Sequence, residues 1–480
     1  MKTNKSTTNY QSRYFMGYVG ERLTENSIKS LLSKYNTPGP RYTSYPTVPF
    51  WDEASFSKLS WLDTFKSAFA ESNTKQGISL YIHLPFCESL CTFCACHKHI
   101  TKRHSVENDY IETLIKEWQL YLEQMPEKPV IKEIHLGGGT PTFFSAENLN
   151  RLINGIFESA VRHEDYEFSF EGHPNNTTKA QLQTLFDLGF TRVSYGIQDY
   201  DAKVQKAINR IQTFEQVTKV TEWSREIGYT SISHDLIFGL PFQTLESIAE
   251  TVSLTKQLMP ERISFYSYAH VPWIKGNGQR GYDEANLPKG NEKRALYDLG
   301  KEMLLELGYV EIGMDHFALK TDGLFKAAEA NTLHRNFMGY TTNSTKLMIG
   351  LGMSAISDSW YGFAQNVKTV KEYQNLVNSG EIPVFRGHIL SEEDTIIRQH
   401  ILNLMCQSKT SWQDETLLFD ALDEVKTMLY KMEQDGIVNT SETSVEIPEN
   451  YRAFLRNVCM AFDLRLHKID RNNQMFSMTV

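Results

Sequence analysis

The sequence predicts an α/β fold in which six or more strand–helix units build a parallel sheet, either open or closed into a barrel. Short apolar or alternating segments typical of strands recur through the middle of the chain. Amphipathic segments typical of helices lie between them, and this alternation favours parallel strands joined by right-handed crossovers. The predicted strands are residues 79–84, 130–136, 167–171, 192–197, 233–239 and 262–269, and the clearest predicted helices are residues 106–125, 146–161 and 244–258.

Each predicted strand ends in residues suited to chemistry. The first strand runs into a loop rich in cysteine, and the second runs into GGGTPT (137–142). The carboxyl ends of parallel strands meet at one edge of the sheet, so we expect the residues there to converge on one site. The other strands bring Glu171, Gln198, Asp235 and the dipeptide 269–270 to this edge.

Two regions flank the predicted barrel. Residues 1–48 are expected to form an arm, with a helix followed by the extended segment PGPRYTSYP (38–46). Residues 49–368 form the predicted catalytic domain, and residues 369–480 form a separate, mostly helical domain.

The C-terminal region resembles a winged-helix module. Residues 412–436 predict helices that end at a glycine, and residues 437–447 predict a hairpin. The acidic face of these helices favours a lid or packing role over DNA binding.

The composition indicates a globular protein of the cytoplasm. The chain has 480 residues, 41% of them hydrophobic, and a net charge of −9, which argues against a general nucleic-acid binder. The N-terminus lacks the apolar stretch of a secretory signal, and no run is long enough to span a membrane. Thiols stay reduced in the cytoplasm, so a disulfide framework is not expected.

Four of the six cysteines lie in PFCESLCTFCACHKH (85–99). Cys87, Cys91 and Cys94 have the spacing C-x3-C-x2-C, and thiolates bind zinc or iron–sulfur clusters. A structural zinc site usually has two separated ligand pairs, although His83, His97, His99 and His104 lie nearby in the sequence. Three cysteines on one short loop fit a 4Fe–4S cluster better, with one iron left open for a substrate or cosubstrate.

This loop, placed after the first strand of a barrel and with Phe93 before its last ligand, resembles that of the radical S-adenosylmethionine (SAM) superfamily. The resemblance implies a partial (β/α)6 barrel. It also implies that the open iron chelates SAM, and that an electron from the cluster splits SAM into methionine and a 5′-deoxyadenosyl radical.

Further motifs resemble one family within that superfamily, the oxygen-independent coproporphyrinogen III dehydrogenases (oxidases). The motifs extend from the arm to near the C-terminus and are PRYTSYP (40–46), YIHLPFC (81–87), Cys96, HLGGGTPT (135–142), YGIQD (195–199), NR (209–210), DLIFGLP (235–241), GMDHFA (313–318), HRNFMGYTT (334–342) and RNVCMAFD (456–463). The resemblance implies a haem biosynthesis enzyme that oxidatively decarboxylates two propionates of coproporphyrinogen III, giving protoporphyrinogen IX.

The same resemblance implies roles for individual residues. Cys87, Cys91 and Cys94 would hold one 4Fe–4S cluster, two SAM molecules would bind, and Cys96 would act near the second SAM or the substrate. The implied SAM-binding residues are Tyr81, Phe93, Gly138, Gly139, Thr140, Glu171, Gln198, Arg210, Asp235, Ala269 and Ile356. Taken one at a time, several have plainer interpretations: GGGTPT as a tight connection, Glu171 and Asp235 as strand-end carboxylates, and Tyr81 and Ile356 as core.

The sequence departs from the family at two places. Glu171 is followed by Gly172–His173 where many relatives carry an acidic residue before the proline. Met338 stands where some relatives carry glutamine; a thioether cannot replace the amide's hydrogen bonds, so Met338 is left out of the catalytic set.

Substrate and partners follow from charge. The substrate has four carboxylates while the chain is net acidic, so Arg41 and Arg335 are candidates to line the pocket, with structural ion pairs as the alternative. The basic segment HKHITKRH (97–104) is a candidate dock for an acidic electron donor such as flavodoxin or ferredoxin, or only a solvated approach to a helix. The family favours a monomer.

Two other functions remain open at this stage. A haem chaperone of the same superfamily keeps the three-cysteine loop but typically has Phe at the position of Cys96 and lacks the arm motif. A zinc-dependent regulator would use the winged-helix-like region.

Overall fold

The six predicted strands form the centre of the fold. In the computed structural model, which describes residues 25–272, 278–279, 281–468 and 476–479, they pair in parallel and in chain order. Their bounds are β1 Ile78–Leu84, β4 Val130–Gly138, β5 Val161–Gly172, β6 Phe190–Gln198, β7 Ser231–Phe238 and β8 Arg262–Ser267. The predicted α/β class with a partial barrel is confirmed. Residues 1–24 of the predicted arm lie outside the described residues.

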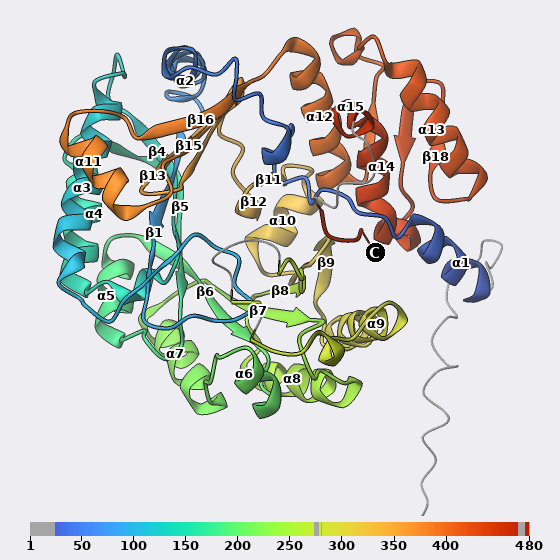
Figure 1. Ribbon diagram of the computed structural model, residues 1–480, viewed down its shortest axis with the longest axis horizontal. Helices are drawn as coiled ribbons and strands as arrows, with labels where there is room; N and C mark the ends of the chain where they lie inside the picture. The colour runs from blue at the N-terminus through green and yellow to red at the C-terminus, as the bar shows by residue number, and fades with distance from the viewer. Residues whose placement is uncertain (1–24, 273–277, 280, 469–475, 480) are drawn as a thin grey trace, which may run out of the picture.

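Strand β1 shows why these segments became strands. All seven of its residues are buried, because a parallel strand is covered on both faces. The helices that follow the strands lie around the outside of the sheet (Figure 1). They are α3 Val106–Leu122, α4 Ala146–Phe157, α5 Lys179–Asp187, α6 Ala202–Ala207, α7 Phe214–Ile227, α8 Leu245–Leu258 and α9 Asn291–Glu306.

The connecting helices begin at clear sequence signals. The N-cap side chains of α4, α5, α7 and α8 each accept a hydrogen bond from the backbone N–H three residues on. Such caps satisfy N–H groups that the helix itself leaves unpaired. They fix where each helix starts, and therefore the length of the loop between strand and helix.

Among the described residues the sheet has twelve strands, six more than the predicted ones. Strand β13 (Leu347–Leu351) pairs in parallel with β1, and three antiparallel strands follow it outward: β14 (Ile356–Ser359), β15 (Gly362–Asn366) and β16 (Val384–Ile389). At the other edge, β10 and β9 add to β8 in antiparallel fashion, with bounds His316–Ala318 and Val310–Gly313.

A separate hairpin lies against the strands of the barrel. It consists of β11 (His334–Asn336) and β12 (Gly339–Thr341). The Thr341 hydroxyl donates to Glu133 of β4, and the Phe337 ring packs edge-on against Tyr81 of β1. The hairpin therefore touches two strands of the sheet from its inner side.

The C-terminal region has its own hydrophobic core. Helices α12 (Glu392–Gln407), α13 (Leu422–Gln434) and α14 (Leu455–Phe462) surround it, with a small sheet of β17 (Lys409–Ser411), β18 (Asn439–Thr440) and β19 (Ser444–Glu446). The arm contributes Leu31, Tyr42 and Tyr45 to this core. In Figure 1 the arm, in blue, crosses from the C-terminal region toward the barrel.

The helices predicted over residues 412–436 cover less of this segment than expected. Residues 412–436 do not form helix throughout, since α13 begins only at residue 422. Trp412 instead donates its backbone N–H to Thr443 of the hairpin, and Asp414 caps a single 3-10 turn, Glu415–Leu417. The hairpin predicted within residues 437–447 is present as β18 and β19.

The domain boundaries stay a prediction. Helix α11 (Val370–Asn378) and β16 lie after the predicted boundary at 368/369, yet β16 pairs with β15 of the large sheet. This pairing favours placing the boundary after Ile389.

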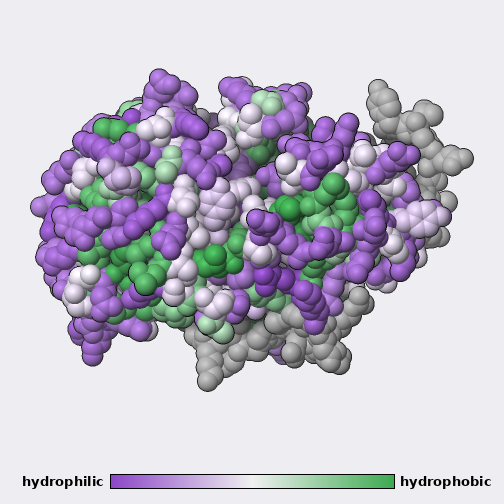
Figure 2. All heavy atoms as spheres, turned by 90° about the horizontal axis from the view of Figure 1, so that it is seen from above, coloured by the Kyte–Doolittle hydropathy of each residue, from purple (hydrophilic) through white to green (hydrophobic). Residues whose placement is uncertain are grey.

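Polar and charged side chains cover most of the face seen in Figure 2, and apolar side chains gather between them on the left, near the middle and right of the middle. Within the described part of the chain, no helix combines the length and the apolar character needed to cross a membrane.

Candidate active site at the carboxyl ends of the strands

The cysteine loop is held at its base and at its tip. At the base, the short strands β2 (Phe86–Cys87) and β3 (His99–Ile100) pair in parallel. At the tip, Thr92 donates its backbone N–H to Ile208 at 2.9 Å, and the Asn209 amide donates to the Leu90 carbonyl at 2.7 Å. The loop is thereby joined to the segment after β6, at the carboxyl end of the sheet.

The four thiols of the loop differ in their surroundings. Cys91 is buried, Cys87 and Cys94 are half-buried, and Cys96 is exposed. Burial raises the pKa of Cys87 to about 11, although the Thr140 hydroxyl donates to its sulfur at 3.3 Å. A hydrogen bond from Cys96 lowers the pKa of Cys94 to about 6 and raises that of Cys96 well above its usual range.

Cationic groups lie next to these sulfurs. Arg210 donates through Nη1 to Cys91 Sγ at 3.5 Å and through Nη2 to the Gly196 carbonyl at 2.6 Å. The Lys98 ammonium donates to the carbonyls of Cys94 and Cys96, each at 3.2 Å. Positive charge and N–H or O–H donors at sulfur stabilise thiolates, the form that binds iron.

The donor set fits a three-thiolate iron–sulfur cluster with an anionic ligand beside it. Arg210 Nε is buried and has no hydrogen-bond partner among the described residues, so a donor is left facing the site. Within the same residues, no group of three or more His, Cys, Asp or Glu side chains is close enough to hold a single metal ion. Thiolates of a 4Fe–4S cluster bind different irons and need not converge on one atom.

Gly138 gives the end of β4 its close approach to β1. Its φ is +110°, and a Cβ there would lie 2.6 Å from the His83 ring. His83 is itself buried and fixed, because Nδ1 lies 3.1 Å from the Tyr81 hydroxyl and Nε2 lies 2.8 Å from the His97 carbonyl. Only glycine fits this position without moving the imidazole.

The next two residues join β4 to the cysteine loop. The backbone N–H of Gly139 donates to Leu84 at 2.9 Å, and that of Thr140 donates to Phe86 at 3.0 Å. A Cβ on Gly139 would lie 2.5 Å from the Pro85 carbonyl. The predicted glycine-rich segment therefore packs directly on the first cysteine.

His135 lies between Glu171 and Tyr81 and contacts both. His135 of β4 stacks on the Tyr81 ring with centroids 6.1 Å apart, and its Nε2 is 3.5 Å from the Glu171 carboxylate. The Glu171 side chain is 47% exposed, so a ligand can reach it.

Gln198 and Asp235 lie on neighbouring strands. Gln198 ends β6 with φ +72° and is buried. Asp235 of β7 accepts a hydrogen bond from Ser194 at 2.9 Å, and burial raises its pKa to about 6. The charge of Glu171 also raises the pKa of this carboxyl, and the charge of Arg210 lowers it. The structure thus brings together residues from β5, β6 and β7.

Phe93 and Ala269 are linked by a residue that the sequence analysis did not identify. The Gln279 amide donates to both of their carbonyls, each at 3.0 Å. The Phe93 ring packs against the apolar cluster that contains Ile208, Ile237 and Tyr268.

Ile356 begins β14 near β1. Its backbone lies against Gly350, where a Cβ would be 2.5 Å from the Ile356 carbonyl, and Gly350 pairs with Tyr81. Each residue predicted for the site thus lies at or near the carboxyl edge of the sheet, while its role stays a prediction.

Sequence reasoning assigned no site role to His135 or Gln279, and it considered His83 only as one of the histidines near a possible zinc site. The two histidines were visible in principle, because His83 and His135 lie near the ends of strands next to predicted site residues. Gln279 carries no such signal, since it acts through backbone carbonyls.

The substrate candidates differ from each other. Arg41 pairs with Asp315 at 2.8 Å and donates to the Ser267 carbonyl at 3.1 Å, so the structural ion pair considered for it is present. Arg335 has no carboxylate partner among the described residues. In the basic segment, His97, His99, Lys102, Arg103 and His104 are exposed.

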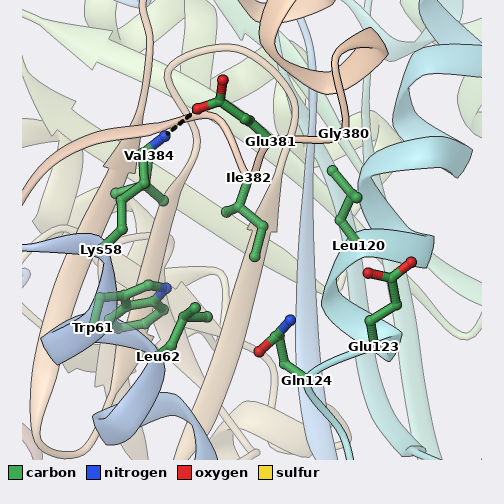
Figure 3. A pocket seen from close by; sticks show the side chains of 10 residues that line it. All are labelled: Lys58, Trp61, Leu62, Leu120, Glu123, Gln124, Gly380, Glu381, Ile382 and Val384. Carbon is green, nitrogen blue, oxygen red and sulfur yellow. Dashed lines mark hydrogen bonds and ion pairs between the residues drawn. The ribbon is translucent and has the colours of Figure 1, made fainter.

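A pocket elsewhere on the molecule does not involve these residues. It lies between α2 (Lys58–Ser72), α3 and the chain entering β16, and Lys58 pairs with Glu381 at its rim (Figure 3). None of the predicted site residues lines it.

Comparisons with known proteins agree with this site. The radical SAM superfamily profile matches residues 81–255, which include the cysteine loop. The oxygen-independent coproporphyrinogen III oxidase of Helicobacter pylori strain J99 is 38% identical over 90% of this chain and 96% of its own length. That of Escherichia coli K12 is 36% identical over 93% and 97%.

A solved structure resembles the whole fold. It is a coproporphyrinogen III oxidase from Escherichia coli, described as a radical SAM enzyme, with TM-score 0.83 and 34% identity over 91% of this chain and 98% of that one. This chain therefore belongs to the oxygen-independent coproporphyrinogen III oxidase family of the radical SAM superfamily.

Proposed function

We propose that this chain oxidatively decarboxylates two propionate side chains of coproporphyrinogen III to vinyl groups without oxygen, giving protoporphyrinogen IX for haem biosynthesis. The carrying observation is identity of 36–38% with oxidases of this name over at least 90% of the chain, with the cysteine loop at the carboxyl edge of the sheet. A hydrogen atom is taken from the β-carbon of each propionate, and the resulting substrate radical then releases carbon dioxide and passes one electron to an external electron acceptor.

The cofactors proposed are one 4Fe–4S cluster on Cys87, Cys91 and Cys94, and two SAM molecules. When bound, they supply a 5′-deoxyadenosyl radical that can remove the β-hydrogen. Thr140 and Arg210, which donate to Cys87 and Cys91, would stabilise the thiolates.

The residues at the strand ends would bind and orient SAM. Arg210 Nε, which is buried and has no partner within the described ranges, is suited to the carboxylate of the first SAM. Glu171, exposed at its carboxylate, is suited to a hydroxyl or ammonium group. Gly138, Gly139 and Thr140 present backbone at close range. The remaining predicted contacts, from Tyr81, Phe93, Gln198, Asp235, Ala269 and Ile356, surround these groups.

Shielding of the radical would fall to aromatic side chains. Tyr81 and Phe337 meet edge-on at 4.8 Å, and Phe93 packs in an apolar cluster on the other side of the loop. Such side chains exclude water from a reactive centre. Cys96, exposed and hydrogen-bonded to Cys94, is proposed to act on the substrate side.

An acidic one-electron donor such as flavodoxin or ferredoxin would dock on residues 97–104, whose basic side chains lie beside the loop. We further propose that the enzyme works as a monomer in the cytoplasm.

The test is anaerobic incubation of fully loaded protein with SAM, a reductant and coproporphyrinogen III, followed by mass spectrometry. Divinyl product, with methionine and 5′-deoxyadenosine, is expected. A full iron and sulfide complement without any vinyl product would contradict the proposal and would favour the related haem chaperone, whereas zinc in place of iron and sulfide would favour a regulator.

A further inference from the structure

Arg335 is a buried cation with unused hydrogen-bond donors. Its side chain lies on β11 and is 7% exposed. Nη2 donates to the Arg41 carbonyl at 3.4 Å, and the guanidinium lies 4.5 Å from the centroid of the Tyr340 ring. Nε and Nη1 have no partner among the described residues.

Two other buried arginines are paired with carboxylates, and a third, Arg456, has no carboxylate partner among the described residues but donates to four backbone carbonyls. Arg262 pairs with Asp322 at 2.6 Å, and Arg398 donates to both carboxylate oxygens of Asp358 at 2.8 and 2.9 Å. A buried charge without a counter-charge is strongly unfavourable. The guanidinium of Arg335 is therefore suited to an anion that comes from outside the chain.

His316 adds a third donor next to it. The rings of His316 and Tyr340 lie 5.3 Å apart, so the imidazole and the Arg335 guanidinium both contact one aromatic side chain. Burial, aided by the charge of Arg335, lowers the pKa of His316 to about 3, so the ring is neutral at pH 7. Its Nε2 is 3.4 Å from the Tyr266 hydroxyl, while Nδ1 is buried and has no partner in the part of the chain that the structure describes.

These groups adjoin the active site. Phe337, two residues after Arg335, contacts Tyr81, and Tyr266 lies on β8 next to β7, which carries Asp235. Arg335 is thus close to the strand ends without belonging to the residues expected to bind SAM.

We propose that Arg335 and His316 form a seat for one carboxylate, which Arg335 neutralises and His316 receives through Nδ1–H. The inference rests on the proposed function, which supplies two sources of a carboxylate at this place: a propionate of the tetrapyrrole substrate, or the methionine moiety of SAM. Arg41 is not part of the seat, because Asp315 already neutralises it.

The first test is equilibrium binding to cluster-loaded holoenzyme without turnover. Coproporphyrin III, the stable oxidised tetracarboxylate, is followed by fluorescence, and SAM by calorimetry. Arg335→Met is expected to weaken binding of one of the two ligands by about 10- to 100-fold, because a charged hydrogen bond is lost. Arg335→Lys is expected to weaken it less, because that bond is only lengthened.

The control is Arg162→Met. Arg162 also lies over aromatic rings, 4.8 Å from the centroid of Phe157, but at the amino-terminal end of β5. It should leave both affinities unchanged. Weaker porphyrin binding identifies a propionate, weaker SAM binding identifies the methionine carboxylate, and unchanged affinity for both ligands overturns the proposal.

A second measurement uses the wild-type holoenzyme and so does not depend on folding of a variant. Four coproporphyrin III monoamides, one per propionate, and the carboxamide of SAM are compared with the parent acids. One amide should bind wild-type protein about as weakly as its parent acid binds Arg335→Met. Equal affinity of every amide and its parent acid would contradict a carboxylate seat. Because binding is measured without turnover, an inactive enzyme would contradict the proposed function and leave this result standing.

Discussion

Cys96 lies two residues after Cys94 in the same loop, but we propose different roles for these two thiols: Cys94 binds the cluster and Cys96 acts near the second SAM or the substrate. Replacing Cys96 with Ser should leave Cys87, Cys91 and Cys94 able to hold a full cluster while product formation falls. The physical reason is that Cys96 is the exposed thiol and is not one of the three proposed ligands, which share the C-x3-C-x2-C spacing. Iron and sulfide analysis and electron paramagnetic resonance measure the cluster content of Cys96→Ser, and Cys94→Ser, which should lose the cluster, is the comparison. Loss of the cluster from Cys96→Ser would contradict the division.

Gly138 provides a prediction about stability. Gly138→Ala should lower the free energy of unfolding by about 3 kcal/mol, because the new methyl meets the buried His83 ring at a positive φ. Gly380→Ala is the matched control: φ is +81° but nothing lies within 4 Å, so only the backbone cost of about 1 kcal/mol remains. Thermal unfolding measures the stability of both variants. Equal losses of stability would contradict the prediction and show that the His83 ring moves aside at little cost.

Single residues of the site were predictable where a side chain type is itself the signal. Cysteines at a fixed spacing and glycines after a strand carry such a signal. Gln279 carries none, because it holds two backbone carbonyls in place, and the signal of His83 is only its position near the end of a strand. Arg335 was selected by charge alone, and only its burial and unused donors distinguish it from Arg41.

At the scale of elements, Glu117 of α3 joins four segments of the barrel. It is fully buried and accepts hydrogen bonds from Gly352 after β13, Asn366 of β15 and Tyr373 of α11, each at 2.7 Å. Each partner is neutral, so burial raises the pKa of Glu117 to about 7.

The raised pKa predicts a dependence of stability on pH. The folded protein keeps a proton on Glu117 that the unfolded chain releases near pH 4.5, so this carboxyl lowers stability as pH rises from about 5 to 7. Glu117→Gln removes that dependence. The free energy of unfolding of the variant minus that of wild type should therefore rise by up to about 3 kcal/mol as the pH goes from 5 to 8. Denaturant unfolding at several pH values, with the exposed Glu123→Gln as control, measures it; a constant difference would contradict it.

Elements were predictable where periodicity is long. The six parallel strands and their helices follow from apolar runs and caps within each segment. The antiparallel strands β14, β15 and β16 were not predicted, because short strands at the edge of a sheet are defined by distant pairing partners. Residues 412–421 carry a helical pattern, yet the bond from Trp412 to the hairpin overrides it.

At the scale of the whole molecule, Arg456 of α14 joins the arm to the C-terminal segment. It donates to the carbonyls of Gly39 and Pro40 in the arm, and to those of Met478 and Thr479. These acceptors are all backbone atoms, which is why the sequence did not predict that the arm packs on this region.

Arg456→Met should release the arm. The loss of several charged hydrogen bonds is expected to cost about 2–4 kcal/mol and to speed protease cleavage within residues 36–48. Arg452→Met, which removes a bond to the Glu311 carbonyl but none to the arm, serves as control. Unchanged cleavage of the arm in Arg456→Met would show that its apolar contacts suffice.

The parallel pairing of β1 with β13 has a consequence for how the protein is made. Ser79 pairs with Met348, so one edge of the strand that leads into the cysteine loop stays unpaired until the ribosome has passed residue 348. An unpaired strand edge invites wrong partners, and contacts between distant residues form slowly. Insertion of iron and sulfide is therefore expected only after residues 348–351 have been made, when the strand beneath the cysteines has both of its neighbours.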